Sequence, residues 1–379
     1  MNAVKFGIIG AGDAANFHTL AFKQKPDAKV QYVAVYDINE KNANRLAKMA
    51  KLVPYTNFEA FIKHDFEAVL VAVPHYLHAE MVEKVAECGK HVLCEKPMAP
   101  TLEECDRMIT VTRRANVKFM IAENHRFLPA HVKIKELIDK GFLGKVYLGR
   151  TYEGAFVPKK TFFDVNNWQF TFDKGGGGVL ADQGVHKFGM LNYFLGEVES
   201  GEAFLGKALQ SPPNKGEDNA IMFLRYRCGA MIEVMVSSTT IHPLNNTTEL
   251  HGTNGHLLED HSWEKPIKIF SNHEEAEIKG EYYYIAVEHG AYPSYYTISA
   301  FHEDTHFAEC ILLDKDPEYA PEQAKDAVAS VLLGYLSVKL GRRTTMAELM
   351  HIAHTRGTKQ ILEGLEPFIQ KNYEPLQWK

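Results

Sequence analysis

The 379-residue chain has little cysteine, no excess of positive charge and no long apolar run. Its five cysteines are odd in number and show no CxxC spacing, which argues against a disulfide framework and a zinc ribbon. The formal net charge of -6 gives no basic surface for nucleic acid or an anionic membrane. No apolar stretch approaches bilayer length, and residues 1–5 run into a strand pattern without a signal-peptide pattern. These absences indicate a cytoplasmic protein that works on small molecules.

The arrangement of apolar residues predicts two domains of the α/β class. Residues 1–125 alternate buried-strand runs with helical segments, which is typical of a doubly wound parallel sheet. Beyond residue 126 the chain shows alternating strand patterns, as in 147–152 and 231–236, and a hairpin signal at Asn254-Gly255. We therefore expect a dinucleotide-binding domain over 1–125. We expect an α+β domain over 126–379, with a mainly antiparallel sheet and helices on one face.

A glycine pattern stands between the first strand, residues 4–9, and the first helix. The sequence from Gly10 to Ala15 fits GxGxxA. Gly10 permits a tight turn, Gly12 lets the backbone approach a pyrophosphate, and Ala15 allows close helix packing. The helix N-terminus then supplies N–H donors to the anion. This segment predicts a dinucleotide site made of Gly10, Gly12, Asp13, Ala14 and Ala15.

An acidic residue, Asp37, ends the second strand, residues 30–36. A carboxylate at this position accepts hydrogen bonds from the adenosine ribose and repels a 2′-phosphate. The position of Asp37 therefore favours NAD over NADP as the cofactor. The alternative is that Asp37 only caps the helix that begins at residues 39–42.

A lysine follows another predicted parallel strand, in the sequence Glu95-Lys96-Pro97 after the apolar run 91–94. Ligands of open α/β sheets lie beyond the carboxyl ends of the strands, so Lys96 is placed to meet a bound ligand. The alternative is an ordinary exposed loop lysine.

A second group of chemically useful residues follows four glycines at 175–178. Asp182 and His186 are four residues apart on a predicted helix that ends at Gly196, so they share one face. A carboxylate and an imidazole beside a glycine loop can hold a substrate hydroxyl and take its proton. The alternative is a surface pair of the kind that is common at this spacing.

Three segments together resemble the Gfo/Idh/MocA family, named after glucose-fructose oxidoreductase, inositol dehydrogenase and a rhizopine-catabolism protein. They are the GxGxxA turn, residues 86–97 and the GGxxxDxGxH pattern at 177–186. The resemblance covers most of the chain. It implies a Rossmann domain followed by a domain with a large open sheet, through which dimers or tetramers often form. It also implies NAD-dependent hydride transfer to or from a secondary hydroxyl of a sugar, sugar derivative, glycoside or cyclitol.

The resemblance also implies roles for single residues. Lys96 would orient the substrate and steady charge at the reacting oxygen, His186 would be the general base or acid, and Asp182 would help hold the carbinol. The positions matching the cofactor side are Val73, Pro74, His75, His78, Glu95, Lys96 and Asn124. The positions matching the substrate side are Lys96, Arg126, Trp168, Asp182 and His186. For His75 and His78 a purely structural role is the alternative.

This chain departs from the family pattern at two positions, with Gly189 where many members carry a second acid and Gln169 where others carry arginine. Both departures concern the substrate hydroxyls. They leave the identity of the substrate open more than the class of reaction.

Residues 302–306 fit HExxH, the zinc metalloprotease pattern, but no third ligand follows at a family spacing. We therefore expect no metal, and the resemblance implies a helix near the sheet of the second domain. Two other functions stay open. One is a glycosidase that uses held NAD for transient oxidation and elimination, and the other is a non-catalytic NAD(P)-sensing regulator. The joint presence of Lys96, Asp182 and His186 argues against the regulator.

Overall fold

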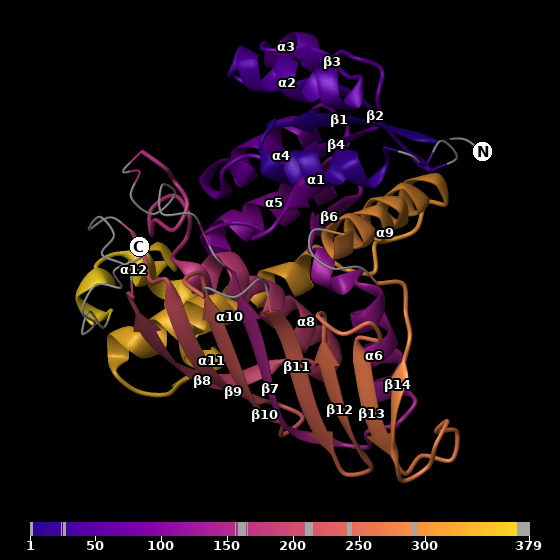
Figure 1. Cartoon of the computed structure of the whole chain (residues 1–379). Helices are drawn as coiled ribbons and strands as arrows, with labels where there is room; N and C mark the ends of the chain where they lie inside the picture. The colour runs from indigo at the N-terminus through magenta and orange to yellow at the C-terminus, as the bar shows by residue number, and fades with distance from the viewer. Residues whose placement is uncertain are drawn as a thin grey trace, which may run out of the picture. The chain divides into compact units, whose positions relative to one another are not determined.

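The computed structural model describes residues 3–23, 25, 28–155, 157, 164, 166–208, 215–240, 245–289 and 294–369 (Figure 1). By its internal contacts the chain forms two compact units. Unit 1 comprises Met1–Ala99, Glu103–Phe127 and Tyr295–Lys325. Unit 2 comprises Pro100–Leu102, Leu128–Ser294 and Asp326–Lys379. No helix in the described ranges is long and apolar enough to cross a bilayer.

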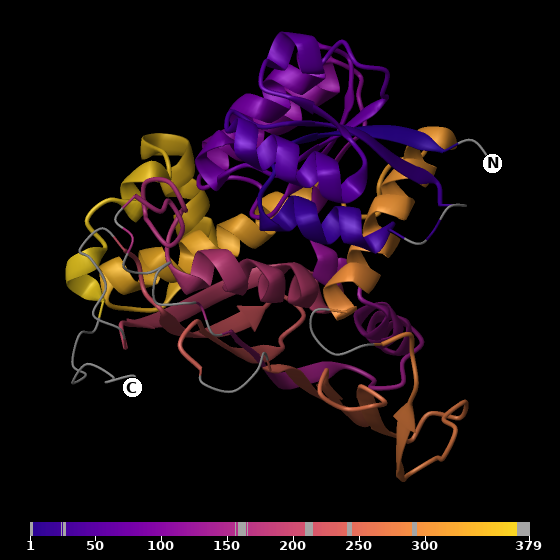
Figure 2. The same cartoon turned by 45° about the horizontal axis from the view of Figure 1, so that its top comes forward.

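Unit 1 is built on a parallel sheet of six strands in the order β3-β2-β1-β4-β5-β6. This is the strand order of a Rossmann fold, and it confirms the predicted parallel sheet. The central strands are apolar along almost their whole length because helices cover both faces, as Figure 2 shows. The strands are β1 (Val4–Ile9), β2 (Val30–Tyr36), β3 (Val53–Tyr55), β4 (Ala68–Val71), β5 (His91–Glu95) and β6 (Phe119–Ala122).

The helices of unit 1 follow the strands in alternation. They include α1 (Asp13–Ala21), α2 (Glu40–Ala50), α3 (Phe58–Phe61), η1 (His75–Leu77), α4 (His78–Glu87), α5 (Leu102–Arg114) and η2 (Asn124–Arg126). Asparagine side chains cap two of them: Asn39 accepts the N–H of Lys41 at 3.0 Å, and Asn57 accepts the N–H of Ala60 at 2.9 Å. These caps satisfy backbone donors that a helix N-terminus leaves unpaired.

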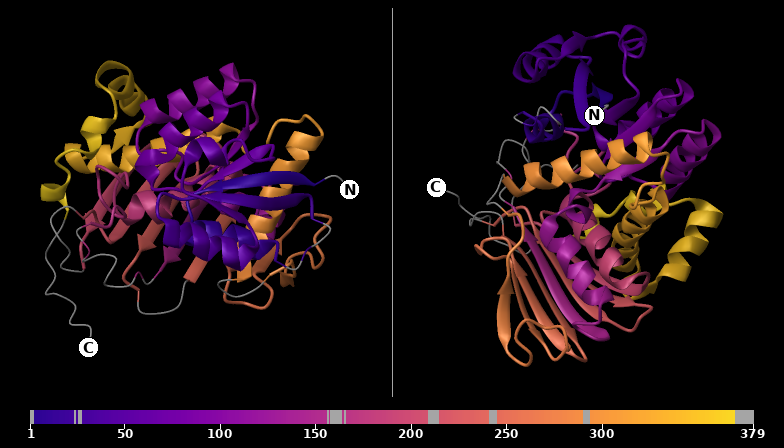
Figure 3. Two further views of the ribbon diagram at one scale, coloured as in Figure 1. Left: turned by 90° about the horizontal axis from the view of Figure 1, so that it is seen from above. Right: turned by 90° about the vertical axis from the view of Figure 1, so that its right-hand side faces the viewer.

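Helix α9 (Ser294–Leu312) differs from the expectation drawn from the sequence. The predicted division at 125/126 placed it in the second domain, and the resemblance implied a position near that domain's sheet. Its residues from Tyr295 onward instead belong by their contacts to unit 1. The ring of Phe307 meets the ring of Phe6 on β1 edge to face, with centroids 6.2 Å apart. Figure 3 (left) shows α9 beside the strands of this sheet.

Unit 2 is built on a mixed sheet of nine strands in the order β14-β13-β12-β11-β7-β10-β9-β8-β15. Only the β7–β10 pair is parallel among the described pairings, which confirms the mainly antiparallel prediction. The expected hairpin at Asn254-Gly255 joins β11 to β12. The strands are β7 (Val146–Gly154), β8 (Val198–Gly206), β9 (Asn219–Tyr226), β10 (Met231–Ser237), β11 (Asn245–Gly252), β12 (Gly255–Asp260), β13 (Ile267–Ser271), β14 (Tyr282–Ile285) and β15 (Thr344–Thr345).

The helices of unit 2 lie on one side of this sheet (Figure 3, right). Strands such as β9 therefore alternate buried and exposed residues, as a sheet covered on one face requires. The helices include α6 (Pro129–Asp139), η3 (Leu180–Gly184), α8 (Val185–Leu195), α10 (Pro321–Leu340), α11 (Met346–Arg356), α12 (Lys359–Leu362) and η4 (Glu366–Phe368). The predicted helices after Pro129, over 321–340 and from Met346 are confirmed.

Candidate active site

The glycine turn after β1 has the shape that a dinucleotide needs. Gly10 has a φ of 95°, and a Cβ at this position would lie 2.1 Å from the carbonyl oxygen of Ala72. A Cβ on Gly12 would meet no atom within 4 Å. The absence of a side chain on Gly10 thus lets the turn pack against the backbone of Ala72. The absence of a side chain on Gly12 leaves open space beside the turn. Asp13 and Ala14 open helix α1, and Ala15 in its first turn is fully buried. These residues fit a bound pyrophosphate.

Asp37 is tied directly to the glycine turn. Its Oδ2 accepts the backbone N–H of Ala11 at 2.8 Å, and its Oδ1 accepts the N–H of Asn39 at 2.7 Å. The N-cap residue of helix α2 is Asn39 and not Asp37, so capping does not account for the position of the Asp37 carboxylate. The carboxylate is held at the end of β2, half-buried and beside the turn.

Arg45 also braces the glycine turn, and the sequence patterns gave no sign of it. Its guanidinium donates to the carbonyl oxygen of Ala11 at 2.6 Å and to Asn16 Oδ1 at 3.2 Å. An arginine in the middle of α2 looks like a solvent-exposed helix residue. Only the packing of α2 against the turn shows that it supports the cofactor segment.

The turn that carries Lys96 is held by backbone and side-chain contacts. Glu95 Oε2 accepts the backbone N–H of Lys96 at 3.1 Å. The ring of His78 lies 2.9 Å from the carbonyl oxygen of Pro97 through Nδ1, and 2.9 Å from that of Val73 through Nε2. Burial lowers the pKa of His78, so the neutral ring donates to one of these carbonyls at a time. Lys96 is half-buried, which differs from an ordinary exposed loop lysine.

The other predicted residues of unit 1 lie in short turns after β4 and β6. Pro74 precedes η1, and His75 is 7% exposed with its ring centroid 5.6 Å from that of His78. Asn124 donates through Nδ2 to Ser299 Oγ at 3.1 Å. The guanidinium of Arg126 lies over the ring of Tyr319, 5.1 Å from its centroid. Both turns follow the carboxyl ends of parallel strands, where open α/β sheets bind ligands.

The four-glycine loop of unit 2 packs tightly against protein. A Cβ on Gly178 would lie 2.0 Å from the carbonyl oxygen of Glu217, and one on Gly177 would lie 1.9 Å from the hydroxyl of Tyr335. Glu217 Oε1 accepts the N–H of Leu180 at 3.0 Å and the hydroxyl of Tyr335 at 2.8 Å. At these two positions glycine is required by the buried Glu217 and Tyr335 and not by a ligand.

Asp182 and His186 follow this loop on a continuous helical segment. Asp182 lies in η3, a single turn of π-helix, and His186 lies in the first turn of α8. His186 is 3% exposed and Asp182 is half-buried, so the pair is not the surface pair that the spacing alone allowed. The predicted C-terminal cap at Gly196 is confirmed by its φ of 84°. A π-turn inside a helix is frequent at functional sites.

Trp168, the remaining predicted substrate residue, lies half-buried ahead of the same loop. Its carbonyl oxygen accepts the hydroxyl of Thr171 at 2.7 Å. The neighbouring Gln169 accepts the ammonium of Lys215 through its carbonyl oxygen at 2.9 Å. Lys215 is fully buried and fixes this segment.

The HExxH motif lies on helix α9 of unit 1. His306 Nε2 accepts the backbone N–H of Glu318 at 3.0 Å, and Glu303 is 1% exposed. Among the described residues, no candidate metal cluster contains His302 or His306. Glu303 belongs to a different cluster, with His18 and Asp304, whose potential ligand atoms lie within 4.8 Å of one another.

Comparison with known proteins adds to this geometry. Residues 4–123 match the model of the oxidoreductase family with an NAD-binding Rossmann fold, and residues 131–258 match the GFO/IDH/MocA C-terminal domain. The chain belongs to the Gfo/Idh/MocA family of oxidoreductases. The predicted resemblance is confirmed, and so is the expectation of an NAD-binding Rossmann fold.

Relatives within the Gfo/Idh/MocA family cover most of this chain. Myo-inositol 2-dehydrogenase of Thermotoga maritima is 27% identical over 346 residues, which are 89% of this chain and 96% of that protein. Levoglucosan dehydrogenase of Pseudarthrobacter phenanthrenivorans is 28% identical over 318 residues, 74% of this chain and 79% of that protein. A solved levoglucosan dehydrogenase in complex with NADH superposes with a TM-score of 0.80 at 22% identity, covering 91% of this chain and 99% of that one.

Another solved structure with the Gfo/Idh/MocA fold is described as a putative NADPH-dependent oxidoreductase of Desulfitobacterium hafniense. It superposes with a TM-score of 0.77 at 23% identity over 92% of this chain and 99% of that one. Membership of the Gfo/Idh/MocA family therefore does not determine whether the cofactor is NAD or NADP. The choice depends on the residues at the end of β2.

Proposed function

We propose that this protein is an NAD-dependent dehydrogenase that oxidises, or in reverse forms, a secondary hydroxyl of a sugar, sugar derivative, glycoside or cyclitol. The observation that carries the proposal is the fixed carboxylate of Asp37, bound to the N–H of Ala11 in the glycine turn at 2.8 Å. A carboxylate there suits a ribose 2′-hydroxyl and opposes a 2′-phosphate, which favours NAD. The relatives named inositol and levoglucosan dehydrogenase support the class of substrate.

The residues of the chain supply binding and proton transfer. The nicotinamide of bound NAD supplies the hydride acceptor. Lys96 stabilises negative charge at the reacting oxygen, His186 takes the hydroxyl proton, and Asp182 accepts a hydrogen bond from the carbinol. Reduction uses the same groups in the opposite direction. We assign the cofactor side to the turns at Val73–His75 and Glu95–Lys96 together with His78 and Asn124, and the substrate side also to Arg126 and Trp168.

The test is NADH formation, followed by absorbance, on a panel of inositols, anhydrosugars, free sugars and glycosides. Lys96→Ala and His186→Ala are each expected to lower kcat by about 100-fold or more while NADH still binds. Lys84→Ala is the matched control, because this lysine is exposed on α4 and pairs with Glu80 on the same helix. Its activity is expected to equal that of the wild type.

The outcomes separate the three functions considered for the chain. Turnover of a panel alcohol that is lost in the two variants supports the dehydrogenase. Cleavage of a glycoside without net NADH would identify the glycosidase. Binding of NADH with no turnover of any alcohol, oxo-sugar or glycoside would overturn both enzymatic functions in favour of the regulator.

We also propose that the chain forms a homo-oligomer through the bare side of the nine-stranded sheet, here called the open face. Strand register places Phe223 opposite Glu233 and Glu202, and Met231 opposite Arg225 and Leu148, all on this face. Its large apolar side chains are strongly exposed, with Phe204 at 60%, Met231 at 55% and Phe223 at 52%. Exposed apolar area of this kind marks interaction surfaces.

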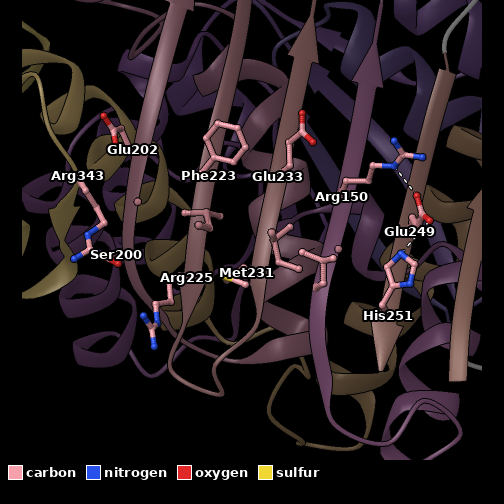
Figure 4. A pocket seen from close by; sticks show the side chains of 15 residues that line it. Arg150, Ser200, Glu202, Phe223, Arg225, Met231, Glu233, Glu249, His251 and Arg343 are labelled. Carbon is pink, nitrogen blue, oxygen red and sulfur yellow. Dashed lines mark hydrogen bonds and ion pairs between the residues drawn. The ribbon is translucent and has the colours of Figure 1, made fainter. Parts of the chain in front are cut away.

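The charges of the open face suit a second copy of the same chain. Figure 4 shows carboxylates and guanidinium groups interspersed around Phe223, with Arg150 paired to Glu249. A two-fold interface brings a surface against itself, so it needs both signs of charge. The charged residues that line the central hollow of this face are Arg150, Arg225, Arg343, Glu202, Glu233 and Glu249.

A further inference from the structure

A buried histidine of helix α1 lies between two carboxylates of unit 1. His18 is 3% exposed, and its Nδ1 is 2.9 Å from both carboxylate oxygens of Asp304. Its Nε2 is 3.1 Å from Glu95 Oε1. Because each ring nitrogen faces an acceptor, both nitrogens carry a proton and the ring is an imidazolium. Burial opposes this charge, but Asp304 and Glu95 raise the pKa of His18 well above its usual range.

Two other ionisable groups beside His18, Tyr32 and Glu303, have pKa values shifted toward their neutral forms. The hydroxyl of Tyr32 on β2 donates to Asp304 Oδ2 at 2.6 Å, and burial raises the pKa of Tyr32 well above its usual range. Glu303 on α9 is 1% exposed, and neither of its carboxyl oxygens has a hydrogen-bond partner among the described residues. Burial raises the pKa of Glu303 well above its usual range, so this carboxyl keeps its proton. His18 thus pairs with two carboxylates, those of Asp304 and Glu95.

This cluster continues without a gap into the turn that carries Lys96. Glu95 uses Oε1 to accept from His18 and Oε2 to accept the backbone N–H of Lys96 at 3.1 Å. The path runs from Asp304 on α9 through His18 on α1 to Glu95 at the end of β5. Three elements that are distant in sequence thereby fix one peptide group, and hydrogen bonds to charged groups are stronger than neutral ones.

We propose that His18 is a positioning residue whose imidazolium holds the Glu95 carboxylate, and through it the backbone turn that presents Lys96. The proposal rests on the role of Lys96 in the proposed function. It also assigns a structural role to the HExxH segment, because the carboxylate of Asp304 and the carboxyl group of Glu303 both lie beside His18. The segment then supports the active-site turn through α1.

Two substitutions of His18 separate its two contacts. In His18→Asn the amide nitrogen reaches the place of Nδ1, so the bond to Asp304 can form and the bond to Glu95 is lost. In His18→Gln the longer side chain can donate to Glu95 without a charge. We expect His18→Asn to lower kcat by about 10-fold or more, with the Kd of NADH changed less than about threefold, because a misplaced group costs rate. The Gln variant is expected to lose less.

The matched control is His64→Gln. This histidine is half-buried in unit 1 and its Nδ1 lies 3.0 Å from the hydroxyl of Tyr55, away from the cluster. Its substitution is expected to leave both kcat and NADH affinity unchanged. A fall in kcat of His64→Gln equal to that of His18→Asn would show a general loss of packing and overturn the positioning role.

The pH dependence of kcat distinguishes positioning from loss of stability. Removing a positive charge favours the protonated forms of neighbouring groups, so the profile of both His18 variants is expected to move to higher pH. A variant that is only less stable would lower the profile without moving it. An unmoved profile together with wild-type kcat in His18→Asn would overturn the proposal.

A measurement without substrate keeps the proposal separate from the proposed function. In protein labelled with ¹⁵N-histidine, one ring that is absent from His18→Gln spectra should show two protonated nitrogens at pH 8.5. A neutral ring there would overturn the proposal even if the enzyme is active. If the wild type turns over no alcohol, the proposed function fails and this spectrum still decides the protonation state of His18.

If His18→Asn does not fold, Glu95→Gln is the second variant. Because it removes a negative charge beside His18, the His18 ring should lose its proton at a lower pH than in the wild type.

Discussion

The carboxyl group of Glu217 accepts the backbone N–H of Leu180 at 3.0 Å, where the glycine loop becomes the helical segment of Asp182 and His186. Burial raises the pKa of Glu217 to about 7, against the opposing hydrogen bonds from Leu180 and Tyr335. The folded chain therefore keeps this proton to about pH 7, whereas the unfolded chain loses it near 4.5. The support under the loop is a carboxylic acid at mildly acidic pH and a buried anion above neutral pH.

The first prediction concerns stability against pH. Between about pH 4.5 and 7 the unfolded state releases the Glu217 proton and the folded state keeps it, so this group makes folding less favourable as pH rises. The contribution of Glu217 to the free energy of unfolding is fully present below pH 4.5 and is lost as the pH rises to about 7. The pKa shift of this carboxyl corresponds to a loss of up to about 3 kcal/mol. Glu217→Gln cannot titrate, so its free energy of unfolding should fall less over this range. Guanidinium unfolding at several pH values measures both slopes, and parallel curves would contradict the expectation.

The fold of unit 1 was predictable because its signals are local. Strands such as β4 and β6 are buried on both faces, so each reads as a continuous apolar run. The short strand β3 gives no such run, because it contains a proline and its first two residues are exposed. The place of α9 could not be predicted, because it depends on contacts such as Phe307 with Phe6, which no local pattern records.

Some residues of the candidate site can be predicted from local sequence, and others cannot. Lys96, Asp182 and His186 each stand in a short motif that can be recognised in the sequence. The residues that hold them do not. His18 is 77 positions from Glu95 and 286 from Asp304, and Glu217 is 37 positions from Leu180. Such supporting residues are single histidines and glutamates that stand in no recognisable motif, and only tertiary contacts reveal them.

The second prediction compares the two glycines of the cofactor turn. A methyl group on Gly12 meets no protein atom within 4 Å, so Gly12→Ala should fold with an unchanged melting temperature. It would occupy the space that a pyrophosphate needs, so the Kd of NADH should rise about tenfold or more. Gly10→Ala should instead lower the melting temperature, because its Cβ would lie 2.1 Å from the Ala72 carbonyl oxygen. Thermal unfolding and NADH fluorescence titration test the pair, and equal NADH affinity in Gly12→Ala and wild type would refute the assignment of the turn.

The third prediction concerns the choice of cofactor. Asp37→Asn keeps an oxygen that can accept from the N–H of Ala11 but removes the negative charge. The ratio of NADP to NAD dissociation constants should therefore fall about tenfold, which corresponds to about 1.4 kcal/mol. Calorimetric titration of both cofactors into wild type and variant measures the ratio. Because each protein is compared with itself, a general loss of binding does not change the result, and an unchanged ratio would rule out Asp37 as the discriminating residue.

The fourth prediction concerns the open face. Phe223 is 52% exposed on β9, between Glu202 and Glu233 of the neighbouring strands in register. In a two-fold interface the phenyl ring would be covered, and Phe223→Glu would bury a third carboxylate beside two others. Such a charge costs several kcal/mol when it is buried without a partner. Light scattering after size exclusion should therefore show a smaller species for Phe223→Glu than for wild type, while circular dichroism shows that the fold is retained.

Val132→Glu is the matched control, because Val132 is 45% exposed on helix α6 and not on the open face. It should keep the wild-type mass, and a monomeric wild type would exclude the interface altogether.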